Sequence, residues 1–177
     1  MEKLRQKIIK LNLKKQNYYL NTIYIFIKYF INTKLYKLNI NNNQLNNQIK
    51  NYYNGERYVG QIINGLREGK GTYYFNNGNR YEGDFRNGNK EGKGIFYFKS
   101  GDRYEGDYRN DKKEGKGIFY YNNGDIYEGD FRNDKREGKG IYYYNNGDRE
   151  MGDYSNDNPI GKHITLTKNG EIKTDIY

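Results

Sequence analysis

Residues 104–126 read YEGDYRNDKKEGKGIFYYNNGDI, and residues 127–149 read YEGDFRNDKREGKGIYYYNNGDR. The preceding segment, 81–103, is a third close copy, 58–80 is a looser copy, and 150–172 is a degenerate one. The sequence therefore repeats with a fixed period of 23 residues. Such a period indicates an array of small structural units, each of which packs only on its neighbours.

Each unit contains two stretches with the character of a β-strand. Residues 81–86 alternate aromatic residues or glycine with charged residues, which is typical of a strand. Residues 95–98 are apolar and lie between glycines, as expected for a second strand. We expect a polar loop at 86–91 and a tight Asn-Gly turn at 122–125. The predicted fold is all-β: an elongated single-layer antiparallel meander of tandem 23-residue β-hairpin repeats, after a low-complexity N-terminal extension.

Glycines recur at four fixed positions in each clean unit. A glycine inside a strand weakens the strand unless a ring or another backbone approaches closely there. We therefore interpret Gly83, Gly106 and Gly129 as clearance for neighbouring tyrosine or phenylalanine rings. The full set of structural repeat glycines is Gly60, Gly69, Gly71, Gly78, Gly83, Gly92, Gly94, Gly101, Gly106, Gly115, Gly117, Gly124, Gly129, Gly138, Gly140 and Gly147.

Stacking of the units aligns aromatic side chains in columns along the sheet. Aromatic cross-strand pairs contribute roughly 0.5–1.5 kcal/mol beyond burial, so a ladder of rings can replace a deep core. The predicted aromatic ladder consists of Tyr58, Tyr81, Phe85, Tyr104, Tyr108, Tyr127, Phe131, Tyr73, Phe96, Phe119 and Tyr142.

The composition excludes other classes of protein. Alanine is absent and valine occurs once, so an α-helical bundle is excluded. The chain has no cysteine and one histidine, which excludes a disulfide framework, a thiolate metal site and a multi-histidine metal site. The array also carries equal numbers of acidic and basic residues: residues 1–50 hold ten of the 31 basic and one of the 22 acidic residues, which leaves 21 of each for 51–177. We therefore divide the chain into a basic leader, 1–50, and a repeat array, 51–177.

The leader supports three interpretations. Residues 39–47 form an Asn- and Gln-rich run of low complexity, which is typical of disorder. The apolar stretch 18–31 is interrupted by polar residues and is shorter than the roughly 20 residues that a spanning helix needs. A disordered leader or mis-assigned start, an amphipathic anchor on a membrane surface, and a spanning or signal segment all remain open.

Motif-like stretches in the array do not predict catalysis. The Gly-Lys-Gly at 92–94 lacks the Ser or Thr and the following helix of a phosphate-binding loop. Residues 153–157 resemble a calcium loop but lack its glycine and flanking helices. His163 has no evident nucleophile or metal ligand beside it in the sequence. We expect no catalytic residue, no metal and no cofactor.

The pattern Tyr-Glu-Gly-Asp-(Phe/Tyr)-Arg-Asn, followed by Glu-Gly-Lys-Gly-Ile and Asn-Gly-Asp, resembles the MORN repeat (membrane occupation and recognition nexus). The resemblance covers 58–172 and is most specific over 81–149. It implies a β-hairpin array that acts as a non-catalytic scaffold, as in junctophilins and ciliary proteins. Some phosphatidylinositol-phosphate kinases carry such repeats before a catalytic domain, and we expect no such domain here.

Two functions follow as hypotheses. The first is a scaffold that binds partner proteins and tethers cytoskeletal or ciliary structures to a membrane, in the cytoplasm at a membrane–cytoskeleton junction or cilium. The alternative is a module that binds anionic phospholipid. In that case two basic columns would line one loop edge and contact lipid phosphates: Lys90, Lys113, Arg136 and Lys93, Lys116, Lys139.

Two further predictions concern partners. We do not expect nucleic acid as a partner, because the neutral array lacks the basic stripe that nucleic-acid binding needs. The degenerate unit 150–172 is interpreted as a cap or as an exposed edge that pairs with a partner. Homodimerisation through this C-terminal unit is the corresponding prediction.

Overall fold

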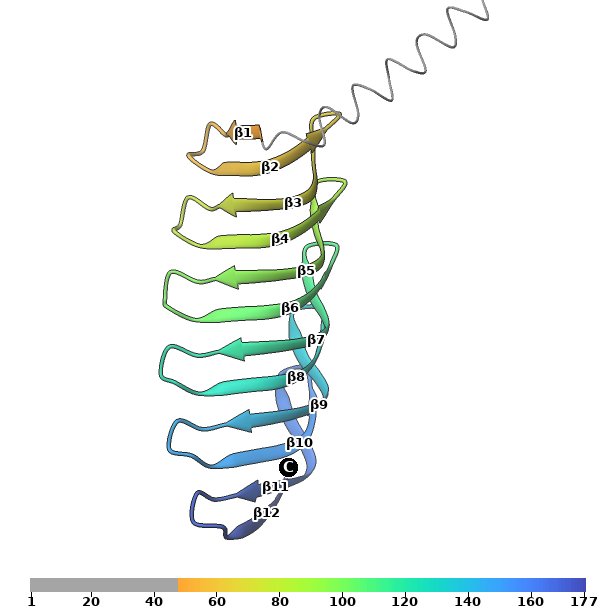
Figure 1. Ribbon diagram of the computed structural model, residues 1–177. Helices are drawn as coiled ribbons and strands as arrows, with labels where there is room; N and C mark the ends of the chain where they lie inside the picture. The colour runs from red at the N-terminus through yellow and green to blue at the C-terminus, as the bar shows by residue number, and fades with distance from the viewer. Residues whose placement is uncertain (1–47) are drawn as a thin grey trace, which may run out of the picture. The chain divides into compact units, whose positions relative to one another are not determined.

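A computed structural model of the chain describes residues 48–177, which form one twelve-stranded antiparallel sheet. The strands lie in the sheet in the order in which they occur along the chain, so the predicted all-β meander of hairpins is confirmed (Figure 1). The interpretations of the leader concern residues outside the described part. The first strand begins at Gln48, ahead of the boundary drawn at residue 51.

Successive units contribute a seven-residue strand and a nine-residue strand. The strands are β1 (Gln48–Asn51), β2 (Arg57–Ile63), β3 (Leu66–Tyr74), β4 (Arg80–Arg86), β5 (Asn89–Tyr97), β6 (Arg103–Arg109), β7 (Lys112–Tyr120), β8 (Ile126–Arg132), β9 (Lys135–Tyr143), β10 (Arg149–Ser155), β11 (Asn158–Leu166) and β12 (Ile172–Ile176).

The predicted polar loop at 86–91 is instead a two-residue hairpin turn. Arg86 ends β4 and Asn89 already begins β5, so only Asn87 and Gly88 lie between the strands. Both have positive φ, at 51° and 86°, which is the conformation of a type I′ turn. The equivalent turn of the next unit is Asn-Asp. The prediction of a loop was wrong because these polar residues are strand ends around a tight turn.

The connection at 122–125 is wider than predicted. Of these residues only Gly124 has a positive φ, 93°, so Asn-Gly does not form a type I′ pair here. The Gly124 backbone N–H donates to the Tyr121 carbonyl at 3.0 Å, and the Tyr121 N–H donates to the Asp125 carbonyl at 2.9 Å. This is a three-residue loop in which glycine occupies the left-handed position. The tight two-residue turn therefore lies where we expected the longer loop, and the longer loop lies where we expected the tight turn.

The nine-residue strands carry a β-bulge at the second repeat glycine. Between the pairs Gly106–Gly117 and Asp107–Glu114 the register of β6 and β7 shifts. Gly115, which lies at this shift, has a φ of 66°. A bulge of this kind bends a strand and increases its local twist. Beyond the bulge, the hairpin end of each unit turns out of the plane of the straight strand segments (Figure 1).

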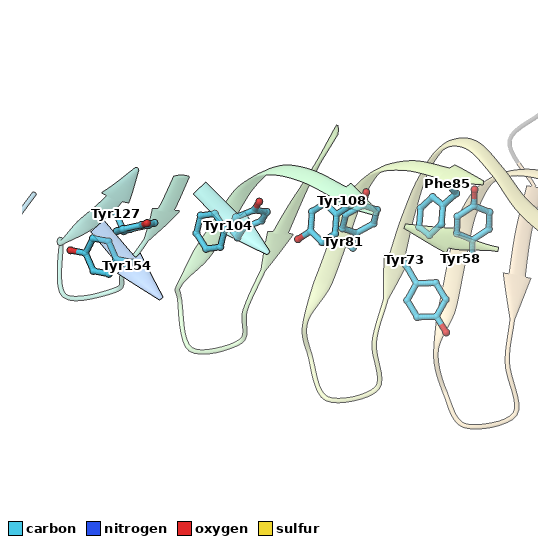
Figure 2. Packing of buried hydrophobic residues seen from close by; sticks show 9 residues of the cluster. Tyr58, Tyr73, Tyr81, Phe85, Tyr104, Tyr108, Tyr127 and Tyr154 are labelled. Atoms are coloured by element: carbon cyan, nitrogen blue, oxygen red, sulfur yellow. The ribbon is translucent and has the colours of Figure 1, made fainter. Parts of the chain in front are cut away.

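The core of the array is an unbroken column of rings on one face of the sheet. Tyr58, Tyr81, Tyr104 and Tyr127 have no exposed surface. The Phe85 ring meets the rings of Tyr58 and Tyr81 edge-on, with centroids 5.1 and 5.2 Å apart, and the same contacts recur in each unit (Figure 2). Edge-to-face pairs of this kind are favourable beyond their burial.

Beneath these rings the glycines form a continuous row, with one glycine in each strand from β2 to β10. A Cβ on Gly106 or Gly117 would lie within 3.0 Å of the Tyr104 side chain. The Tyr104 hydroxyl crosses this row and donates to the Asp107 carbonyl at 3.2 Å. The glycines thus leave the volume that the tyrosines fill.

Carboxylates of the repeat link consecutive units through backbone amides. Asp134 accepts a hydrogen bond from the Lys113 N–H at 2.9 Å, and Glu114 accepts one from the Asn133 N–H at 3.2 Å. At the other end of the unit, Asp125 accepts from the Asn145 N–H at 2.8 Å. The recurrence of these carboxylates in successive units therefore has a structural cause.

Candidate functional site

The face opposite the ring column carries a groove of about 1130 Å³ that extends from β3 to β11. Its floor is the glycine row, because on this side no side chain covers the backbone. Two rows of side chains, one on each side of the glycines, form its walls. None of these side chains belongs to the buried aromatic core.

The first wall alternates acidic and apolar residues from strand to strand. Glu105 pairs in register with Ile95 on one side and Ile118 on the other, and Glu128 pairs with Ile118 and Ile141. In β10 a methionine, Met151, takes the acidic position and pairs with Ile141 and Ile164. The wall thus repeats every second strand and becomes wholly apolar near the C-terminal unit.

The second wall alternates lysine and aspartate. Lys93 lies 2.8 Å from Asp107, and the same ion pair occurs at the equivalent residues in the units on either side. The aspartates are partly buried, whereas the lysine side chains are about three-quarters exposed at Lys70 and Lys116. Exposed pairs of this kind contribute little to stability, and their ammonium groups remain accessible to a ligand.

A third row, beside the acidic and apolar wall, was missed by the sequence analysis. Arg80 stacks on Tyr97 at 4.2 Å, and Arg103 stacks on Tyr120 at 4.0 Å. These residues are two positions from the wall residues along each strand, so alternation places them on the groove face. The alternation of the two faces along the strand, continued from Phe96 to Tyr97, would have placed Tyr97 on the groove face and identified the row.

The two basic columns predicted to contact lipid do not share an edge. Lys90 and Lys113 lie among the core rings, where the Lys113 ammonium is 5.2–5.4 Å from three ring centroids. Burial lowers the pKa of both lysines. Arg136 packs in the same way over Tyr127 and Tyr154. Lys93, Lys116 and Lys139 line the groove instead. The prediction of a single basic edge is corrected by this separation.

The remaining candidate features are a metal site, a membrane-spanning helix and His163. Within residues 48–177 no group of three or more His, Asp or Glu residues is close enough to hold a metal ion. The structure described for this part also has no helix that is long and apolar enough to cross a membrane. His163 is buried in the C-terminal unit, away from the groove lining.

Fold and groove together define a class: a β-hairpin repeat array that presents one continuous, regularly patterned surface. The family model of the MORN repeat matches residues 58–80, 81–103, 104–126 and 127–149, and the chain belongs to this family. The resemblance noted in the sequence is thereby confirmed. A comparison with curated proteins finds no match.

One solved structure has a similar fold, and a second is reported with it. The TCP domain of Drosophila melanogaster SAS-4 (dCPAP), solved in complex with a proline-rich motif of Ana2 (dSTIL), is 19% identical with a TM-score of 0.51, over 74% of this chain and 72% of that one. The TCP10 domain of Danio rerio CPAP is 13% identical with a TM-score of 0.34, over 73% of each chain. At such identities the first of these similarities concerns the fold alone.

Proposed function

We propose that this protein is an interaction scaffold that holds an extended segment of a partner protein along the groove. The observation that carries the proposal is the uninterrupted groove over β3 to β11, whose wall side chains have no part in the aromatic core. Apolar, acidic and basic side chains alternate along it, which suits recognition of a polypeptide. The binding of a proline-rich motif by the TCP domain of similar fold supports a partner of this kind. We assign no catalytic step.

A peptide library displayed on phage and selected on the full chain tests this function. Ile118 lines the middle of the groove, so Ile118→Asp should remove the selected peptides by placing a charge on the apolar wall. Ile172→Asp is the matched control, because Ile172 lies in β12, is 74% exposed and is not part of the groove. Selected peptides that bind the Ile118→Asp protein unchanged would contradict the proposal.

One observation favours a second candidate, an anionic phospholipid surface. Lys139 and Lys162 line the C-terminal end of the groove, and within residues 48–177 neither makes an ion pair with an acidic side chain. Free ammonium groups attract lipid phosphates. Sedimentation with phosphatidylserine vesicles, compared with neutral vesicles, should then depend on these two lysines. Unchanged sedimentation of the Lys139→Gln/Lys162→Gln protein would exclude them as the lipid contact.

We also propose that the protein forms a homodimer through its C-terminal unit. The outer edge of β12 has no neighbouring strand within the array, so its backbone groups can pair with a second chain. The Tyr177 N–H donates to the Gly161 carbonyl, so alternation directs the Thr174 N–H outward. Light scattering of the full chain should give twice the monomer mass, and Thr174→Pro should restore the monomer. A monomeric full chain would contradict the proposal.

Location is proposed from the family alone. We place the scaffold in the cytoplasm at a membrane–cytoskeleton junction or a cilium, where such arrays tether structures. Imaging of the tagged full chain tests this, and a uniform distribution through the cell would contradict it.

A further inference from the structure

The groove repeats at a fixed distance along its length. Equivalent wall residues, such as Ile95, Ile118 and Ile141, occur in every second strand. Neighbouring strands lie about 4.8 Å apart, so the pattern recurs about every 9.6 Å. A chain lying along the groove crosses the strands, and it contacts every unit alike only if its side chains recur at that distance on one side.

Among the regular conformations of a polypeptide, one matches this distance. The polyproline II helix has three residues per turn and a rise of about 3.1 Å, so each third side chain returns to the same side after about 9.3 Å. Three residues of a β-strand cover about 10 Å, but the third side chain then points to the opposite side. Seven residues of an α-helix cover about 10.5 Å, which is out of step by about 1 Å in each unit.

We propose, building on the proposed function, that the groove receives a polyproline II segment with an apolar residue at every third position. Each apolar residue contacts one isoleucine of the first wall, at Ile95, Ile118 or Ile141 in turn. The mismatch of about 0.3 Å per unit leaves these contacts aligned along the groove.

The hydrogen bonding of the sheet agrees with this occupant. The backbone groups of β3 to β11 are paired with neighbouring strands, so the groove floor offers no ladder to which a β-strand could add. A polyproline II segment makes no internal hydrogen bonds and keeps its carbonyls available. The ammonium groups along the second wall, at Lys70, Lys93 and Lys116, lie on side chains that are at least 70% exposed, and each has donors beyond its ion pair for such carbonyls.

The C-terminal end of the groove offers the longest apolar stretch of the first wall. Here Met151 replaces the acidic residue of the first wall and, with Ile141 and Ile164, forms three successive apolar positions. Met151 is 43% exposed and Ile164 37%, so both are accessible to a ligand. The largest apolar residue of the bound segment therefore lies at this end.

Fluorescence anisotropy with labelled (Pro-Pro-Leu)4 and the full chain tests the inference. Two control peptides accompany it: an isomer with leucine at every second position, and (Gly-Gly-Leu)4, which keeps the spacing without the helix. We expect each control to bind about tenfold more weakly, because contacts are lost or the flexible chain must be ordered. Ile118→Asp should weaken binding of (Pro-Pro-Leu)4 about tenfold, and Ile172→Asp should leave it unchanged, with circular dichroism showing that both variants fold.

The outcomes separate this inference from the proposed function. Equal binding of the leucine isomer, or binding of (Pro-Pro-Leu)4 that Ile118→Asp does not weaken, overturns the inference. Library peptides that require Ile118 but lack an apolar residue at every third position also overturn it, while the proposed function stands. A library that yields no peptide dependent on Ile118 overturns both.

Discussion

His163 supplies the buried ring of the last unit from the position that a glycine holds in the preceding unit, and Glu150 takes the position of that unit's tyrosine. Glu150 stands at the position of Tyr127, and His163 stands at the position of Gly140. The His163 ring fills the space over Gly152, where an added Cβ would lie within 3.0 Å of it. Its Nε2–H donates to the Asp153 carbonyl at 2.9 Å, as the Tyr127 hydroxyl does to its equivalent at 3.5 Å. The last unit thus keeps the same packing with exchanged residues.

This exchange predicts a strong coupling between the two positions. His163 Nδ1 lies 2.8 Å from the Glu150 carboxylate, which also accepts hydrogen bonds from the hydroxyls of Tyr144 and Tyr177. His163→Gly should leave a cavity and remove one of the partners of the buried Glu150 carboxylate, at a cost of about 2–4 kcal/mol. Glu150→Tyr should introduce a clash with the imidazole, at a cost of about 1–3 kcal/mol.

The double variant, Glu150→Tyr with His163→Gly, restores the arrangement of the preceding units. We expect it to recover most of the free energy of unfolding that either single change removes. Urea unfolding of the full chain, in a double-mutant cycle, measures this coupling. A double variant as unstable as the sum of the two single changes would show that the positions are independent.

Gly106→Val tests the glycine row. A Cβ at Gly106 would lie within 3.0 Å of the Tyr104 hydroxyl and of the Gly117 Cα, and the backbone atom cannot move away. We expect a loss of at least about 2 kcal/mol in the free energy of unfolding, seen as a lower melting temperature. Thr72→Val serves as the control, because Thr72 is a partly buried residue of β3 and the change adds almost no volume. An unchanged melting temperature for Gly106→Val would refute the packing of the ring against the row.

Lys113 tests the role of the cations in the ring column. Its ammonium lies near the rings of Tyr104, Phe119 and Phe131, so Lys113→Glu would place a negative charge against the negative faces of the rings. We expect this change to cost about 2 kcal/mol or more in thermal unfolding.

Two variants control the experiment. Lys113→Arg should change stability by less than about 0.5 kcal/mol, because the next unit carries Arg136 at this position. Lys112→Glu should do the same, because Lys112 is exposed. Equal losses for Lys112→Glu and Lys113→Glu would show that only net charge matters.

The 23-residue period and the alternation in 81–86 were sufficient to predict the meander, because each unit packs only on its neighbours. The turns were assigned to the wrong ends because Asn-Gly can occur at both ends of a unit, as at Asn64-Gly65 and Asn77-Gly78 of the 58–80 unit. Local propensity for positive φ is the same at both. The number of residues between paired strand ends decides the turn type, and that number depends on the register.

The groove was less predictable for the same reason. When residues 86–91 are taken as a loop, Lys90 and Lys93 seem to share an edge. In the structure both belong to β5, with the bulge at Gly92 between them, and they point to opposite faces. The row that contains Arg103 and Tyr120 could have been predicted from the alternation of residues along the strands. The bulge could not, because its only mark in the sequence is a recurrent glycine.

Alkaline pH tests the burial of the tyrosines. Burial raises the pKa of Tyr58 and of Tyr154 to about 12 and raises that of Tyr104 as well, whereas in the unfolded chain these hydroxyls titrate near 10. Above pH 10 the unfolded chain therefore releases phenolic protons that the folded chain keeps. Since the unfolded state then binds fewer protons, the free energy of unfolding must fall as the pH rises.

The fall should reach about 1.4 kcal/mol per pH unit for each buried tyrosine that keeps its proton in the folded state. Burial lowers the pKa of Lys113 from its ordinary value of 10.5, so the folded chain loses this proton before the unfolded chain does. This raises the free energy of unfolding with pH, but only below about pH 10.5, and the buried tyrosines outnumber such lysines. Urea unfolding between pH 8 and 11.5 measures the slope, with tyrosinate absorbance reporting ionisation. Tyr104→Phe should make the slope shallower by up to about 1.4 kcal/mol per pH unit, which corresponds to one proton. A flat profile across this range would mean that the rings are open to solvent.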